Sequence, residues 1–86
     1  MTFEKEIESV TLAELEPGTS ATIHTFSNSS PLTRRIMTMG INPGAVVTVL
    51  RRAPLGDPLE IEVSGCLLTL RHEEALNILV QDVCHG

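Results

Sequence analysis

Aromatic side chains are almost missing from this sequence of 86 residues, which contains no Trp, no Tyr and two Phe. Proteins that bind single-stranded nucleic acid stack bases on aromatic rings inside basic grooves. Basic residues are scarce as well, because six Lys and Arg stand against eleven Asp and Glu, which gives a net charge of −5 at pH 7. The composition therefore argues against nucleic acid as a partner.

Cysteines and long apolar runs are also scarce. Cys66 and Cys84 are too few for the disulfide framework of a small secreted domain. The first ten residues, MTFEKEIESV, contain no apolar stretch of signal-peptide length. No apolar run approaches the roughly 20 residues that are needed to cross a bilayer. We therefore expect a cytoplasmic protein that does not insert into a membrane.

What the sequence does contain is typical of one small globular domain. Hydrophobic residues make up 42% of the chain and charged residues 20%, which separates it from disordered sequences. A chain of this length has room for a single domain with a marginal core. We predict a flexible amino terminus over residues 1–10, one domain over residues 11–83, and a tail over residues 84–86.

The pattern of apolar residues predicts a mainly β fold. Thr11 and Glu14 have the spacing of a capping box, so a helical turn begins there, and Ser30-Pro31 opens a short helix that Gly40 ends. A further helical turn is expected at residues 72–76. Short strands are expected at residues 19–26, 45–51, 59–63, 66–70 and 78–83. These elements predict a small, partly open barrel with two or three short helices.

The clearest local prediction is a hairpin between residues 59–63 and 66–70. Ser64-Gly65 supplies a two-residue turn, and the register pairs Val63 with Cys66. Cys66 then falls on the inner face, where a lone cysteine is usually a small buried hydrophobe. The strand at 45–51 is apolar on both faces, which predicts a central or covered position.

Catalytic motifs are missing. The sequence has no P-loop, no dinucleotide fingerprint, no HExxH and no nucleophile elbow. Asp57 is the one tempting carboxylate, but its place before Pro58 is explained by turn formation. The sequence therefore predicts a protein that is not an enzyme.

Metal ligands are present without a recognisable arrangement. None of the histidines and cysteines shows the close paired spacing of a structural zinc site. Adjacent Cys84 and His85 are the weak candidates for binding a soft metal. The alternative is that all these side chains are scattered surface and core residues. The residues in question are His24, His72, His85, Cys66 and Cys84.

Arg34-Arg35 is the one paired basic feature. On a helix the two side chains point about 100° apart, so they do not form a fork for one phosphate. They either line a solvated helix face or form a small positive contact that docks a protein partner.

The loop RAPLGDP, residues 52–58, has two prolines that limit its backbone freedom. A stiff loop with an apolar Leu55 at its tip loses less entropy on docking, which favours recognition through Leu55, Gly56 and Asp57. The alternative is that Leu55 folds under and plugs one end of the barrel.

The segments GINPGA at residues 40–45 and APLGDP at residues 53–58, after Arg34-Arg35, resemble the ferrous iron transport protein A family, FeoA. The resemblance runs from about residue 12 to residue 80. It implies an SH3-like barrel and an accessory role. Proteins of this kind are thought to bind and regulate FeoB, a membrane transporter of ferrous iron with a cytoplasmic GTP-binding domain.

The alternative to an accessory role is that the domain is a small carrier or sensor that itself binds ferrous iron or another transition metal. The sequence also leaves open a weak homo-oligomer.

Overall fold

The computed structural model describes residues 10–27 and 31–85. Its elements are β1 (Val10–Thr11), the 3₁₀ helix η1 (Leu12–Glu14), β2 (Thr19–Phe26), α1 (Pro31–Thr38), β3 (Val46–Arg52), β4 (Leu59–Val63), β5 (Cys66–Leu70), α2 (His72–Ala75) and β6 (Ile78–His85). The predicted flexible segment, residues 1–10, lies outside the described residues except for Val10.

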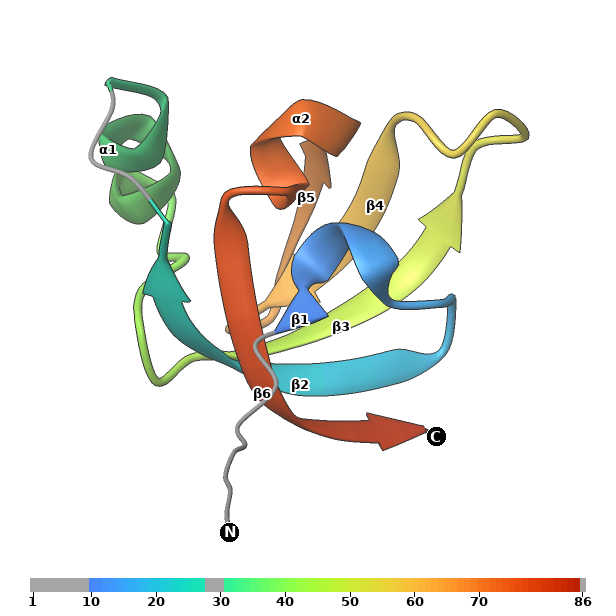
Figure 1. Cartoon of the computed structure of the whole chain (residues 1–86), viewed down its shortest axis with the longest axis horizontal. Helices are drawn as coiled ribbons and strands as arrows, with labels where there is room; N and C mark the ends of the chain where they lie inside the picture. The colour runs from blue at the N-terminus through green and yellow to red at the C-terminus, as the bar shows by residue number, and fades with distance from the viewer. Residues whose placement is uncertain (1–9, 28–30, 86) are drawn as a thin grey trace, which may run out of the picture.

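All described strands belong to one six-stranded sheet in the order β1-β6-β2-β3-β4-β5, and every pairing is antiparallel. The sheet curls into a partly open barrel with α1 and α2 at one end (Figure 1). The predicted mainly β barrel with short helices is thus confirmed. The five predicted strands are present, and the two-residue β1 is an addition. β6 continues to His85, two residues beyond the predicted end.

The core is built from the inward positions of the strands, together with apolar residues of η1, α1 and α2. Its members are Leu12, Ala13, Leu15, Ala21, Ile23, Ile36, Ile41, Val47, Val49, Leu59, Ile61, Val63, Leu70, Ala75, Ile78 and Val80. They are aliphatic without exception, so close packing of branched side chains takes the place of aromatic bulk.

The start of the first predicted helical turn and the end of α1 form as expected, whereas the predicted N-cap of α1, Ser30, lies outside the described residues. The Glu14 carboxylate accepts the Thr11 backbone N–H at 3.1 Å, as in a capping box. At the end of α1, Gly40 has φ +94° and donates to the Met37 carbonyl at 3.1 Å, while Ile41 donates to the Ile36 carbonyl at 3.4 Å. These two bonds form a Schellman motif, which satisfies the last carbonyls of the helix.

The predicted hairpin is confirmed pair by pair, from Val63 opposite Cys66 to Leu59 opposite Leu70. The prediction that Cys66 is buried is wrong, because its side chain is exposed. The physical reason is the strand order. β5 lies at the edge of the sheet, so an inward side chain beside the turn has a neighbouring strand on one side only.

β3 is central in the sheet as predicted, but its outer face is not covered. Val46 is 58% exposed and Leu50 is 40% exposed. The register with β4 shifts between Val49 and Arg51, which is a β-bulge. Because the bulge adds a residue, the inward and outward alternation is reset, and Arg52 then reaches η1 and the residue that follows it. Its guanidinium donates to the carbonyls of Ala13, at 3.0 Å, and Leu15.

Candidate functional site

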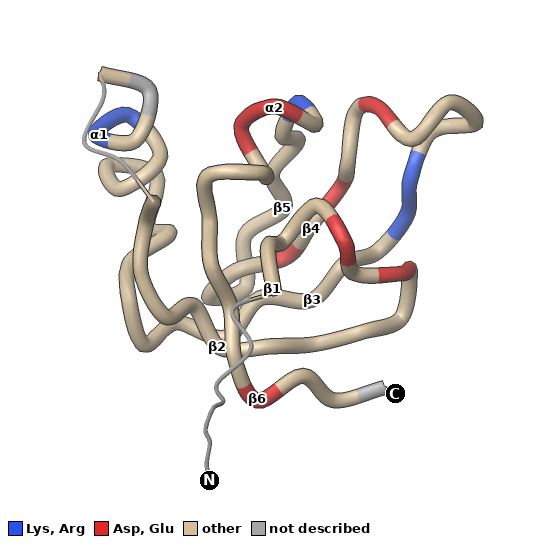
Figure 2. Tube along the Cα trace, viewed as in Figure 1, with Lys and Arg blue, Asp and Glu red and all other residues tan. Residues whose placement is uncertain are grey.

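The residues predicted to contact a partner lie at one end of the barrel. α1 carries Arg34 and Arg35, the β3–β4 loop carries residues 55–57, and α2 stands between them (Figure 1). We call this surface, formed by residues 31–38, 53–58 and 71–75, the helical end. Figure 2 shows basic residues on α1 and near the end of β3, with the acidic residues of α2 between them.

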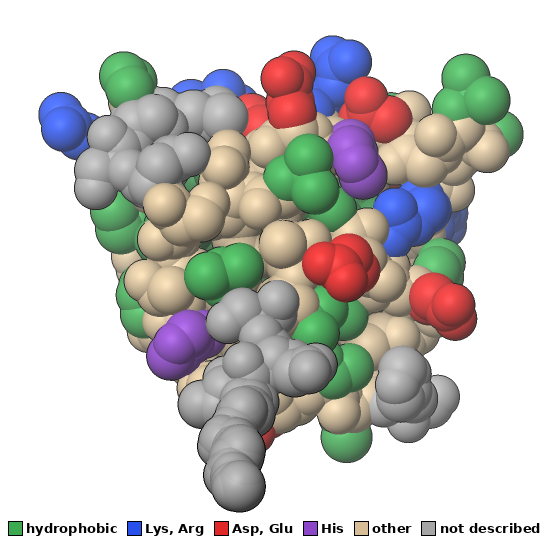
Figure 3. Space-filling model, viewed as in Figure 1, with side chains coloured by type: hydrophobic (Ala, Val, Ile, Leu, Met, Phe, Trp, Pro, Cys, Tyr) green, Lys and Arg blue, Asp and Glu red, His purple; other side chains and the backbone are tan. Residues whose placement is uncertain are grey.

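Leu55 projects from the tip of the β3–β4 loop. Its side chain is 94% exposed. Hydrophobic side chains gather on this projection, at the upper right of the space-filling view (Figure 3). The alternative in which Leu55 plugs the barrel is therefore wrong. Sequence reasoning could not decide this point, since the direction of a loop depends on contacts with distant segments.

The loop is closed by its own backbone bonds. Gly56 donates to the Ala53 carbonyl at 2.7 Å, and Ala53 donates to the Pro58 carbonyl at 3.1 Å. Gly56 has φ +84°, a left-handed conformation in which residues with a Cβ are strained. These bonds fix the direction in which Leu55 points.

Asp57 anchors the loop to the start of α2. Its Oδ1 accepts the His72 backbone N–H at 3.0 Å and the Arg71 Nε–H at 3.3 Å, and its Oδ2 accepts from Arg71 Nη2 at 3.4 Å. The backbone bond from His72 and the side-chain bond from Arg71 lower the pKa of the Asp57 carboxyl below its ordinary value of 3.8. Asp57 thus joins two segments in addition to its predicted role in the turn.

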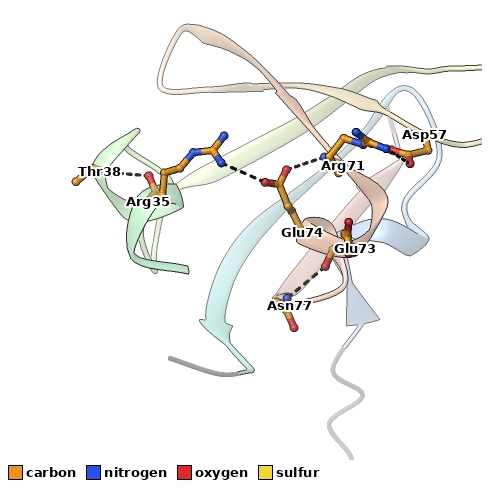
Figure 4. Close-up of polar contacts among 7 residues, drawn as sticks. All are labelled: Arg35, Thr38, Asp57, Arg71, Glu73, Glu74 and Asn77. Atoms are coloured by element: carbon orange, nitrogen blue, oxygen red, sulfur yellow. Dashed lines mark hydrogen bonds and ion pairs between the residues drawn. The ribbon is translucent and has the colours of Figure 1, made fainter. Parts of the chain in front are cut away.

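Glu74 continues this polar network toward α1. Its Oε1 accepts the Arg71 backbone N–H at 2.7 Å, and its Oε2 lies 3.7 Å from Arg35 Nη1. Glu74 is buried, with 7% of its surface exposed, so its carboxylate depends on these partners. Arg35, Glu74, Arg71 and Asp57 therefore form a chain of polar contacts from α1 to the β3–β4 loop (Figure 4).

The two predicted arginines differ in their surroundings. Arg35 contacts Glu74, whereas Arg34 is exposed and forms no ion pair within residues 10–27 and 31–85. The expectation that they point apart agrees with these separate environments. Glu74 and Arg71 were not among the site residues predicted from the sequence. A signal for them was present, because an acid three residues after the N-cap position, here Arg71, can accept the N-cap backbone N–H.

The candidate metal ligands do not converge in the part of the chain that the structure describes. No group of three or more His, Cys, Asp or Glu there could hold a metal ion. Cys84 is exposed on β6 opposite Ser20, and His24 is exposed on β2. The side chain of His85 lies outside the described residues, so the Cys84 and His85 pair stays a prediction.

Among the described residues, none of the helices has the length and apolar character that a membrane crossing requires.

The polar network predicts a pH dependence of stability. The pKa of Asp57 is lowered in the folded state, so its ionised form stabilises the fold at pH values above about 4. This stabilisation is lost as the pH falls through the lowered pKa. We expect Asp57→Asn to lower the melting temperature at pH 7 and to have a smaller effect at pH 3.

Thermal unfolding of both proteins across this pH range tests the expectation. Glu62→Gln is a matched control, because Glu62 is exposed on β4 and none of the described contacts uses its carboxylate. An Asp57→Asn effect that is equally large at both pH values would contradict a role for the ionised carboxylate.

The chain is similar to proteins of known family. Residues 10–82 match the family model described as the FeoA domain. A 70-residue stretch, 81% of the chain, is 34% identical to the Fe(2+) transport protein A/Fe(2+) transporter FeoB fusion protein of Porphyromonas gingivalis. The chain spans 8% of that relative's length.

Solved structures agree with the fold described above. The solution structure of the FeoA protein from Chlorobium tepidum is 42% identical, has a TM-score of 0.78, and covers 84% of this chain and 69% of its own. Stenotrophomonas maltophilia FeoA complexed with zinc, described as a prokaryotic SH3 domain protein, is 28% identical, with a TM-score of 0.76 and coverage of 85% and 91%. The predicted SH3-like barrel is thus confirmed, and the chain belongs to the FeoA family.

Proposed function

We propose that this protein is a non-enzymatic accessory protein that binds the cytoplasmic part of a FeoB-type transporter and regulates the uptake of ferrous iron. One observation carries the proposal: in the relative from Porphyromonas gingivalis, a segment like this chain is joined to an FeoB transporter in one polypeptide. Fusion places the two parts at a high effective concentration, which benefits domains that act together.

The helical end is the surface that best suits this role. Leu55 offers an exposed apolar side chain on a loop that is held by its own backbone bonds and by Asp57. Arg34 adds an exposed positive charge on a protein with a net charge of −5. A surface that is already ordered loses less conformational entropy on binding. More of the free energy of its contacts therefore remains to stabilise the complex.

The proposal is tested by mixing the purified chain with the soluble cytoplasmic part of the transporter from the same organism. Saturable binding is expected, and deletion of the gene should reduce uptake of radioactive ferrous iron by intact cells. A fusion of the two partners should restore uptake. Unchanged uptake after deletion would contradict the proposal.

A metal carrier or sensor is the second candidate, and it is favoured by the zinc complex of the Stenotrophomonas maltophilia relative. Anaerobic calorimetry with ferrous iron separates the two. Saturable binding that disappears in Cys84→Ser/His85→Ala would favour the carrier. Heats equal to those of dilution would favour the accessory role.

A further inference from the structure

β5 is an edge strand without the features that usually protect such strands. It pairs with β4 on one side, and no other strand among the described residues pairs with it. Edge strands in monomeric proteins commonly carry charged residues, proline or bulges that prevent pairing with another chain. The sequence of β5, CLLTL, has no charge and no proline, and its register with β4 is unbroken.

The hairpin geometry directs the free backbone groups of β5 outward. Ser64 and Gly65 have φ of 52° and 80°, which is the two-residue turn that makes Val63 and Cys66 a hydrogen-bonded pair. Bonded pairs alternate along an antiparallel ladder. The N–H and C=O groups of Leu67 and Thr69 therefore point away from β4. No turn or loop bond of the described backbone reaches either residue.

The side chains at these positions are available too. Leu67 is 72% exposed and Thr69 is also exposed. A leucine at this exposure on an open edge would lose its contact with water if a further strand were added.

We propose that β5 is a self-association edge, at which a second copy of this chain pairs antiparallel with the first about a two-fold axis at Leu68. In this register Leu67 lies opposite the partner's Thr69, and Thr69 lies opposite the partner's Leu67. Each outward-directed N–H and C=O of these two residues then meets a matching group, so the edge is complementary to itself.

The charges around β5 favour a second copy at the edge over a copy stacked on the sheet face. Two carboxylates lie beside β5 on the neighbouring strand β4, where Glu62 is opposite Leu67 and Glu60 is opposite Thr69. Across the proposed edge they stand three strand spacings from the partner's carboxylates, about 14 Å, which exceeds the Debye length of about 8 Å. Stacking of the outer faces would instead bring Glu62 toward the same residue of the other copy.

The pairing residues of the proposed edge, Leu67 to Thr69, do not belong to the helical end. β5 runs from the Ser64-Gly65 turn back toward that end, where Leu70 lies opposite Leu59, but the β3–β4 loop takes no part in the proposed pairing. Self-association therefore leaves Leu55 exposed, and the two proposals can fail independently of each other.

Sedimentation equilibrium of the full chain between about 10 μM and about 1 mM tests the association. A reversible monomer–dimer equilibrium is expected, and Leu67→Lys should raise its dissociation constant at least about tenfold, because it places a charge on the edge. Leu50→Lys is the matched control, since Leu50 is an exposed apolar residue on β3, and it should leave the constant unchanged. A monomer at every concentration, or an equal effect of both variants, would overturn the proposal.

Cross-linking tests the register. In a Cys66→Ser/Cys84→Ser background, Leu68→Cys places two thiols opposite each other on the two-fold axis, with Cα atoms about 4.5 Å apart, within the range for a disulfide. Oxidised glutathione should then give a covalent dimer at the protein concentrations at which monomer and dimer coexist. Thr69→Cys should cross-link much more slowly, because it faces the partner's Leu67. Equal cross-linking of both variants would contradict the register.

Discussion

Replacing Leu55 by glutamate should weaken binding to the transporter's cytoplasmic part at least about tenfold. The side chain is 94% exposed in the free protein, so its contacts form only when a partner docks. A glutamate at the centre of an apolar contact loses its hydration in the complex without gaining a partner. The penalty therefore falls on binding, and the melting temperature should change by no more than about 2 °C.

Calorimetry of binding and thermal unfolding, measured on the same variant, test both halves of this expectation. Val46→Glu is the matched control, because Val46 is 58% exposed but lies on the outer face of β3, away from the helical end. Val46→Glu should bind as the wild type does. Equal affinity of Leu55→Glu and the wild type would remove Leu55 from the interface, and equal loss in both variants would point to overall charge instead.

Two other residues of the helical end, Arg34 and Asp57, are expected to affect partner binding in different ways. Asp57 holds the loop through His72 and Arg71, so its effect on binding would act through the direction of Leu55. Arg34 has no ion pair in the described residues, which makes it the arginine of α1 that can contact a partner without breaking an existing one.

The elements that could be predicted from the sequence are those whose signals are local. The hairpin was predicted to the residue because its turn and its alternation agree on one register. The end of α1 was predicted because Gly40 and the apolar Ile41 form a short-range capping motif. In each case the decisive contacts join residues that are near in sequence.

The features that were missed depend on which segments meet in space. The exposure of Cys66 follows from the place of β5 at the sheet edge, which the local pattern does not contain. The contact between Asp57 and Arg71 joins residues 14 apart, and Arg52 reaches Ala13 across 39 positions. Such contacts are set by the fold as a whole, so residue types alone do not reveal them.

The strongest effect on stability is expected at Ile61, at the centre of the hairpin. Its side chain is 0% exposed, and it lies between Val49 on β3 and Leu68 on β5. Ile61→Ala removes buried methyl groups and leaves a cavity, which costs about 2–5 kcal/mol. In a domain of this size 1 kcal/mol shifts the melting temperature by about 4–8 °C, so a fall of at least about 8 °C is expected.

Glu62→Ala is the matched control for Ile61→Ala, because the next position along β4 points to the opposite face. Glu62 is exposed, so its truncation should change the free energy of unfolding by less than about 0.5 kcal/mol. Chemical denaturation of the two variants compares the faces of one strand directly. Since small domains have only about 5–15 kcal/mol of stability, the Ile61→Ala loss is a large fraction of the total. Similar losses at both positions would mean that β4 does not have one face in the core and one in water, and the packing of the aliphatic barrel would have to be reconsidered.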